Sequence, residues 1–318
     1  MQAITEHAST IGAKVDSVLN DYDYTAIRSK AADNQDVCLA FINSRSGEAT
    51  NTVEGNFGDR NNLTAWRAGD TLVQTVASNC ANTVVVVHSV GAIITEPWIN
   101  HPNVTAVLLA HLPGQESGSS LVDVLWGATN PSGKLPYTIA KQQSDYCCTV
   151  KKDWSGFSPT QTFSEGLLID YKHFDTNNIA PRFEFGFGLS YTEFSYAQTL
   201  SVEKTVGNVA AASAFETVVT VTTEIENVGE VKGKETAQLY IEFPAGVPKG
   251  TPVRQLRGFE KVELAPGEKK TVSFEVRKRD LSYWNVAEKK WVVPSGEFGV
   301  VVGRSSRKFE GRGKVSVV

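Results

Sequence analysis

The sequence predicts an α/β sandwich, in which helices flank a mostly parallel sheet, followed by an all-β sandwich. In the first half, short apolar runs alternate with helical stretches, and residues 83–87 are all β-branched. A run of this kind suits a strand that helices cover on both faces. From about residue 194 the hydrophobic period changes to two, which is typical of strands with one buried face. The chain therefore combines two domains of different class.

Each element of the first domain follows from its local hydrophobic pattern. The expected strands lie at 37–42, 83–89 and 104–110, and the expected helices at 3–12, 24–32, 63–78 and 119–126. Residues 13–18 alternate between apolar and polar and are expected to form a further strand. These elements assign residues 1–140 to the α/β sandwich.

A connector at residues 141–193 leads to the second domain. The connector begins with a polar stretch that lacks regular periodicity and is expected to be a loop. The β-sandwich is assigned to residues 194–318. Its expected strands, separated by turn signals, lie at 217–225, 235–243, 269–276 and 296–303.

Composition limits the classes of function. Apolar residues make up 41% and charged residues 21%, as in soluble globular proteins. The formal net charge of −4 and the scattered basic residues argue against a nucleic-acid or anionic-membrane partner. No apolar segment approaches the roughly 20 residues needed to span a bilayer. The glycine-rich turn at 114–118 lacks the spacing and the lysine of a phosphate-binding loop, so we expect no cofactor.

The four cysteines are too few for a disulfide framework and lack the paired spacing of a zinc site, so no metal is expected. Cys38 and Cys80 lie in or beside apolar strands and are expected to be buried, either free or bridged. The adjacent Cys147 and Cys148 do not easily bridge each other, which favours a free thiol or a longer bridge.

Glu48 is the first candidate for catalysis. It follows the apolar run at 37–42 through a small-residue turn, which would lift its side chain into a crevice beyond the strand. A carboxylate in such a place can act as a general acid or base if its surroundings raise its pKa towards neutrality. The structural alternative is a surface glutamate hydrogen-bonded to backbone, which on residue type alone is the commoner case.

Other polar side chains follow the same edge of the predicted sheet, because ligands of open α/β sheets bind beyond the carboxyl ends of the strands. Arg45, His88, Ser89 and His111 all lie there. Arg45 and His111 join Glu48 as candidate catalytic residues. For His88, a core histidine satisfied by backbone is the favoured alternative, because it lies within an apolar strand.

Several motifs recur in the order and at the spacing of one known family. They are 46–48 (Ser-Gly-Glu), 52–56 (Thr-Val-Glu-Gly-Asn), 58–63 (Gly-Asp-Arg-Asn-Asn-Leu), 86–91 (Val-Val-His-Ser-Val-Gly), 112–118 (Leu-Pro-Gly-Gln-Glu-Ser-Gly) and 185–192 (Phe-Gly-Phe-Gly-Leu-Ser-Tyr-Thr). From residue 37 onward the chain closely resembles the C-terminal half of fungal secreted β-glucosidases of glycoside hydrolase family 3. The second domain then resembles the fibronectin type III-like sandwich of the same enzymes.

The resemblance implies that Glu48 is the acid/base catalyst. The family's nucleophile, an aspartate, belongs to an N-terminal (β/α)8 barrel that these 318 residues do not contain. The resemblance also implies that residues 163–192 wrap against the neighbouring domains, with aromatic residues that serve packing. These aromatic residues are Tyr171, Phe174, Phe183, Phe185, Phe187 and Tyr191.

The first residues lack the basic start and apolar centre of a signal peptide. As written, the sequence predicts a cytoplasmic chain derived from a secreted ancestor. Two sequons, at Asn62-Leu63-Thr64 and Asn103-Val104-Thr105, would be glycosylation sites in a secretory setting. Without a leader they are interpreted as inherited, or as signs that the chain is a fragment.

The chain departs from the family at the predicted active-site edge. The usual Ala-Asp-Ser-Gly-Glu-Gly-Tyr has Arg45 for Asp, Ala49 for the second Gly and Thr50 for Tyr. The usual Trp-Ala-Gly before Leu-Pro-Gly-Gln is Leu109-Ala110-His111. Losing an aromatic removes a sugar-stacking surface, and a cation beside Glu48 would lower the pKa of that carboxyl. Thr50, His88 and Ser89 are the expected substrate-binding residues of the altered site.

Three hypotheses follow. The chain is part of a retaining β-glucosidase that works only with a barrel, or it is a stand-alone isomerase, cyclase or lyase that acts on a small molecule through Glu48, or it is a non-catalytic binding module. In the isolated chain, the surface that a barrel would cover is expected to be apolar and exposed, which predicts a homodimer or a larger assembly.

Overall fold

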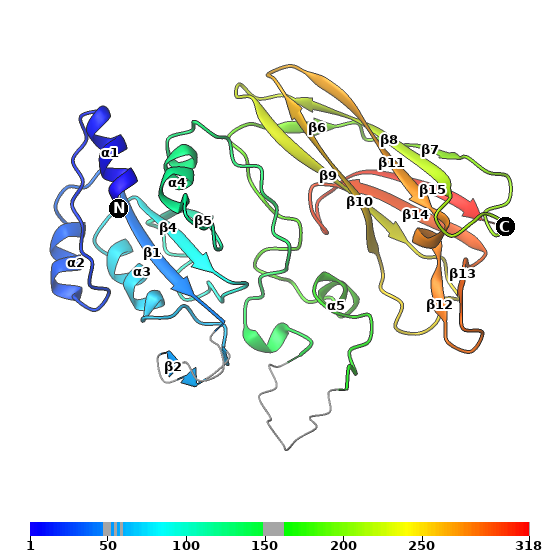
Figure 1. Cartoon of the computed structure of the whole chain (residues 1–318), viewed down its shortest axis with the longest axis horizontal. Coiled ribbons are helices and arrows are strands. Elements are labelled where there is room, and N and C mark those ends of the chain that lie inside the picture. Colours follow the sequence, from blue (N-terminus) through cyan, green and yellow to red (C-terminus); the bar gives the residue numbers. More distant parts are fainter. Residues whose placement is uncertain (47–51, 54–55, 58–59, 149–161, 318) are drawn as a thin grey trace. The chain divides into compact units, whose positions relative to one another are not determined.

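The computed structural model describes residues 1–46, 52–53, 56–57, 60–148 and 162–317 (Figure 1). They form two compact units. The first comprises Met1–Thr129 and Ile139–Thr162, and the second comprises Asn130–Thr138 and Phe163–Val318.

A three-stranded parallel sheet forms the centre of the first unit. Its strands are β1 (Cys38–Ser44), β4 (Thr83–Ser89) and β5 (Val104–Leu109), in the order β1-β4-β5. Strands β1 and β4 pair in register from Cys38 opposite Thr83 to Ser44 opposite Ser89. The predicted parallel α/β sandwich is therefore confirmed.

Helices cover both faces of this sheet because successive side chains of β4 are apolar on both faces. Val85 and Val87 pack into one cluster with residues of α2 (Tyr24–Ala31) and α3 (Gly69–Ala77). On the other face, Val86 packs with α1 (Gln2–Thr10) and α4 (Ser117–Leu125). Among the described residues, none of the helices has the length and apolar character that crossing a membrane would require.

Two expected elements of this unit differ from the structure. Residues 13–18 lie outside any helix or strand, so the predicted strand there is wrong. The helix expected from residue 63 begins only at Gly69, because Arg67 and Ala68 adopt left-handed φ values of 56° and 51°. Gly69 permits close packing, since a Cβ there would lie 2.8 Å from that of Ala65. Short strands β2 (Thr52–Val53) and β3 (Asn56–Phe57) pair as a small antiparallel ladder.

A disulfide joins Cys38, at the start of β1, to Cys80, which follows α3. The bridged alternative is thus the one the structure contains. Cys147 and Cys148 are not in a disulfide. They follow the short 3₁₀ helix η1 (Gln143–Asp145).

Two antiparallel sheets form the second unit, which confirms the predicted β-sandwich. One sheet has the order β10-β9-β14-β15, and the other has β11-β8-β6 with β7 also paired to β8. The strands are β6 (Phe194–Tyr196), β7 (Ser201–Lys204), β8 (Thr217–Asn227), β9 (Gly233–Glu242), β10 (Gln255–Leu264), β11 (Lys269–Arg277), β14 (Gly296–Gly303) and β15 (Phe309–Val317). Their inward residues form one large apolar core between the sheets.

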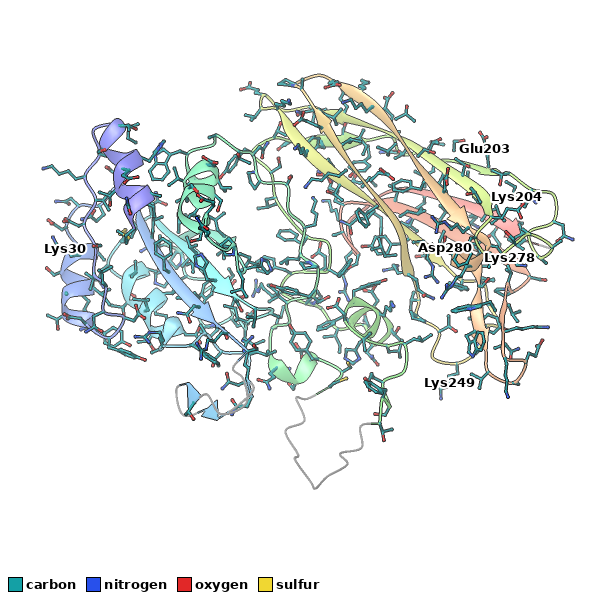
Figure 2. All side chains as sticks on the ribbon, viewed as in Figure 1. Lys30, Glu203, Lys204, Lys249, Lys278 and Asp280 are labelled. Carbon is teal, nitrogen blue, oxygen red and sulfur yellow. A yellow bond between two sulfur atoms is a disulfide. The ribbon has the colours of Figure 1, made fainter. Side chains whose placement is uncertain are left out.

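The 3₁₀ helix η2 (Lys278–Leu281) follows β11 and precedes the hairpin of β12 (Tyr283–Asn285) and β13 (Lys290–Val292). Asp280 accepts a hydrogen bond from the backbone N–H of Arg277 at 2.9 Å. The Lys278 ammonium donates to the carbonyl oxygen of Ala212 at 2.7 Å (Figure 2). These contacts fix the corner where the chain leaves the sandwich.

The aromatic segment before the sandwich packs on it, as its expected packing role requires. Tyr171 and Phe174 of α5 (Tyr171–Thr176) are buried, and the Tyr171 ring lies 4.9 Å from that of Phe185. The Tyr171 hydroxyl accepts a hydrogen bond from the Leu256 N–H at 2.9 Å. Tyr191 differs, because it is 48% exposed.

Asp175 of α5 is the centre of a charge cluster. Its carboxylate is 5% exposed and lies 3.0 Å from Arg307 Nε and 3.3 Å from Arg254 Nη1. Burial raises the pKa of Asp175, and the two arginines act against that rise. The cluster links α5 to the strands and loops of the sandwich.

Replacing Asp175 with Ala is expected to destabilise the second unit by about 3 kcal/mol, because the partly buried Arg307 loses its carboxylate partner and Arg254 keeps only Glu242. Urea unfolding measures this loss. Glu297→Ala is the matched control, since its pair with Lys314 is exposed on both sides and should contribute little to stability. Equal losses in the two variants would refute the structural role assigned to Asp175.

Candidate active site

The carboxyl ends of the three parallel strands meet at one edge of the first unit. Ser44 ends β1 opposite Ser89 of β4, and Arg45 and Val90 follow them. His111 follows β5 by two residues. Glu48 and Thr50, the predicted catalytic acid/base and one predicted substrate-binding residue, lie outside the described residues.

Ser44 is a buried polar group that the sequence did not single out. It is 1% exposed, and its hydroxyl has no hydrogen-bond partner within the described part of the chain. Ser89 is also buried, but its hydroxyl donates to the Gly91 carbonyl oxygen at 2.8 Å. Ser89 therefore fixes the turn after β4, whereas Ser44 keeps an unused hydroxyl at the strand end.

Arg60 ties together the loops that follow β1 and β4. Its backbone N–H donates to the Ser46 carbonyl oxygen, and its guanidinium donates to the Ala92 carbonyl oxygen at 3.0 Å. Arg60 belongs to the motif at 58–63 that carries the family resemblance, but the spacing of that motif does not predict the hydrogen bonds to Ser46 and Ala92. Arg60 thereby connects the described residues that follow β1 and β4.

Arg45 is exposed, and its guanidinium carbon lies 5.9 Å from the centroid of the Trp66 ring. Trp66 is buried, and its backbone N–H donates to the Asn43 carbonyl oxygen at 2.8 Å, so the residue is tied to β1 and its ring can carry the cation. The arginine at this edge therefore has a defined resting place.

His111 is half-buried and has a left-handed φ of 53°. Its Nδ1 lies 3.1 Å from the Leu109 carbonyl oxygen. Strand β4 separates β5 from β1, so the backbones of His111 and Arg45 are two strand spacings apart, or about 10 Å. The two candidates flank the edge from opposite sides.

His88 lies on the face of β4 that α1 and α4 cover. Its ring stacks on Phe41 with the centroids 6.3 Å apart and the planes 15° apart. Burial lowers the pKa of His88 below its ordinary value of 6.5, which favours the neutral imidazole. The packed ring therefore fits the alternative of a core histidine better than that of a side chain exposed to bind a sugar.

Within the described residues, no three His, Cys, Asp or Glu side chains are grouped so that they could hold a metal ion. The polar groups that the edge does offer are hydroxyls, a guanidinium and an imidazole. Such groups can bind and protonate an oxygen-rich ligand, as sugar-processing sites do.

A parallel α/β unit with polar loops at its carboxyl edge, joined to a fibronectin-like β-sandwich, is the architecture of the C-terminal region of certain glycoside hydrolases. Residues 1–191 match the model of the glycosyl hydrolase family 3 C-terminal domain, and residues 235–306 match that of the fibronectin type III-like domain. The chain belongs to glycoside hydrolase family 3.

Individual relatives agree with this assignment. The chain is 47% identical to the probable β-glucosidase L of Aspergillus terreus and 48% identical to the β-glucosidase cel3A of Pyricularia oryzae. These matches cover 100% and 99% of this chain, but 43% and 44% of the relatives. The crystal structure of the β-D-glucoside glucohydrolase from Trichoderma reesei superposes with a TM-score of 0.92 at 50% identity, covering 99% of this chain and 44% of that one. The chain thus spans less than half the length of these relatives.

His88 predicts a pH dependence of stability. The unfolded chain takes up a proton at this residue near pH 6.5, whereas the folded chain does so only at lower pH. Stability from His88 is therefore complete above pH 6.5 and is lost as the pH falls below it. His88→Phe keeps a ring against Phe41 without titrating, so its melting temperature should fall less between pH 7.5 and 5.5. The four other histidines are common to both proteins and so cancel in the comparison. An equal fall in the melting temperature of the two proteins would contradict the lowered pKa of His88.

The left-handed backbone of His111 predicts that replacing this residue with Gly stabilises the chain. A left-handed conformation costs a non-glycine residue about 1–2 kcal/mol, and the family usually has Gly here. His111→Gly should therefore raise the free energy of unfolding by about 1 kcal/mol despite the greater freedom of Gly in the unfolded chain. His111→Ala keeps the strain and loses the contact to Leu109, so it should be less stable than the Gly variant. Thermal denaturation compares the stability of the two variants. If His111→Ala were the more stable, backbone strain at His111 would be excluded as the cause.

Proposed function

We propose that this chain is the acid/base half of a retaining β-glucosidase. The observation that carries the proposal is the match to β-glucosidases over essentially the whole chain, with Ser46, Gly47 and Glu48 in the place of the family's acid/base motif. Glu48 would protonate the leaving oxygen of a β-glucoside and then deprotonate the attacking water.

The nucleophile of this reaction would come from a barrel domain beyond the present 318 residues. Retaining glycosidases place their two carboxyl groups about 5–5.5 Å apart, so the nucleophilic aspartate must face Glu48 across the sugar. Residues at the carboxyl edge would then form one wall of the glucose site. Arg45 and His111 are candidates to position the substrate from opposite sides of β4, and Thr50, His88 and Ser89 are candidates to bind it.

A second candidate function is a stand-alone isomerase, cyclase or lyase that acts on a small molecule. It is favoured by one observation, which is that His111 holds a strained left-handed conformation at a position where the family usually has Gly. Strained residues of this kind gather at functional sites. In this reading Glu48 is the base and His111 the acid, and Arg45 anchors an anionic substrate group.

The purified chain should not hydrolyse nitrophenyl β-glucoside on its own, because an acid without a nucleophile cannot form the glycosyl-enzyme intermediate. Adding a separately expressed family 3 barrel should restore release of nitrophenol. The Glu48→Gln chain should fail to restore it, while Glu6→Gln on α1 should behave as the wild type. Robust turnover by the chain alone that depends on Glu48 would refute the proposal, and turnover of a non-glycoside would favour the second candidate.

Without a barrel, the chain should self-associate through its exposed apolar side chains. Leu112 and Val90, which follow β5 and β4, are 66% and 40% exposed at the carboxyl edge. Sedimentation at micromolar concentration should show a dimer that Leu112→Ser weakens. Leu19→Ser is the matched control, because Leu19 is 81% exposed in the loop between α1 and α2. A monomer under these conditions would exclude the homodimer.

A further inference from the structure

We infer that Asn62 is a site of N-linked glycosylation and that the second sequon, at Asn103, is not. The chemical class of the donor is an oligosaccharide attached to a lipid pyrophosphate, which the secretory pathway supplies together with the transferase. The inference concerns a covalent modification and does not depend on the proposed glucosidase activity.

The disulfide between Cys38 and Cys80, which joins β1 to the end of α3, points to a compartment where this reaction occurs. Structural disulfides form in oxidising compartments, and sequons are modified there. The hydrogen bonds of the two sequons then decide which asparagine is modified, because Nδ2 of Asn62 is not used by the fold and Nδ2 of Asn103 is.

Asn62 presents its amide nitrogen to solvent. The residue is exposed, and its Oδ1 accepts hydrogen bonds from the Thr64 N–H at 3.1 Å and the Thr64 hydroxyl at 2.7 Å. The carbonyl end is therefore held by the sequon itself. Among the described residues, the only acceptor for Nδ2 is Oδ1 of the neighbouring exposed Asn61, at 3.2 Å.

Asn103 uses its amide nitrogen inside the fold. It is half-buried, and Nδ2 donates to the Ala77 carbonyl oxygen at 2.7 Å, at the end of α3. The backbone carbonyl oxygen of Asn103 accepts a hydrogen bond from the Thr83 N–H, and Thr105 lies within β5. A sugar on this nitrogen would remove the bond to Ala77 and place a large polar group against the helix end, so a chain modified there could not reach the native packing.

The reaction balances without a redox partner. Nδ2 of Asn62 attacks C1 of the first sugar, the new N–C bond replaces the C–O bond to pyrophosphate, and the lipid pyrophosphate leaves with the electron pair of that bond. One amide proton is lost to the transferase. A third Asn-x-Ser sequence, at Asn130-Pro131-Ser132, has Pro in the middle position and is excluded as an acceptor.

The test is expression of the full chain behind a secretion leader in yeast, with the protein collected from the medium. N-glycosidase should produce a single step in electrophoretic mobility, and digestion in heavy-oxygen water should mark Asn62 as Asp in the peptide mass spectrum. Asn62→Gln and Thr64→Ala should abolish the step, whereas Thr64→Ser, which preserves the sequon, should retain it. Asn103→Gln should leave the step unchanged and lower the melting temperature, because the bond to Ala77 is lost.

Three results would overturn the inference. The mobility shift could persist in both Asn62→Gln and Thr64→Ala, it could disappear in Asn103→Gln, or the secreted wild type could show no shift. If the chain does not reach the medium, translation in the presence of endoplasmic-reticulum membranes gives the same readings on the protease-protected chain. A label on the peptide of Asn103 instead of Asn62 would also overturn it.

Discussion

The first unit depends on the burial of β4 on both of its faces. A parallel strand in the centre of a sheet has no solvent-facing side, so both sets of alternating side chains must be apolar and both must be covered. Val85 and Val87 require α2 and α3 on one face, and Val86 requires α1 and α4 on the other. Burying side chains of this size stabilises the fold by about 1.5–3 kcal/mol each, more than most single surface contacts contribute.

The position of the candidate site follows from the same constraint. Because β1, β4 and β5 run parallel, their following loops emerge at one edge, and the central position of β4 keeps Arg45 and His111 apart. The polar groups at the edge are held by local contacts, namely Arg45 on Trp66, Arg60 on two loop carbonyls and Ser89 on Gly91. These contacts fix the described polar groups of the edge on the strands that carry them.

Much of the fold could be predicted from the sequence, because strong patterns decided it. The β-branched run of β4 gave the strand bounds 83–89, and the period of two gave β14 at 296–303 as observed. Strand β10 was missed, because its exposed face carries charged residues and its register shifts between Leu256 and Gly258. The strand predicted at 13–18 was wrong, since an alternating pattern becomes a strand only where a partner strand is available.

The site could be predicted less completely. The predicted strand ends located Arg45, Ser89 and His111 at the carboxyl edge, where the structure has them, whereas His88 lies within β4. The left-handed backbone of His111 could not be predicted, because a histidine at that position gives no local signal for it. The unused hydroxyl of Ser44 and the hydrogen bond from Arg60 to Ala92 depend on tertiary contacts, which residue spacing in the sequence does not predict.

We propose Glu48 as the acid/base of a retaining glucosidase assembled from this chain and a barrel. The most direct measurement compares leaving groups in the assembled enzyme carrying Glu48→Ala. Acid assistance matters most for poor leaving groups, so turnover of an alkyl glucoside should collapse while glycosylation by dinitrophenyl glucoside persists. Azide, which needs no base, should then restore turnover and give β-glucosyl azide. Equal losses for both leaving groups, or no azide product, would contradict the acid/base role of Glu48.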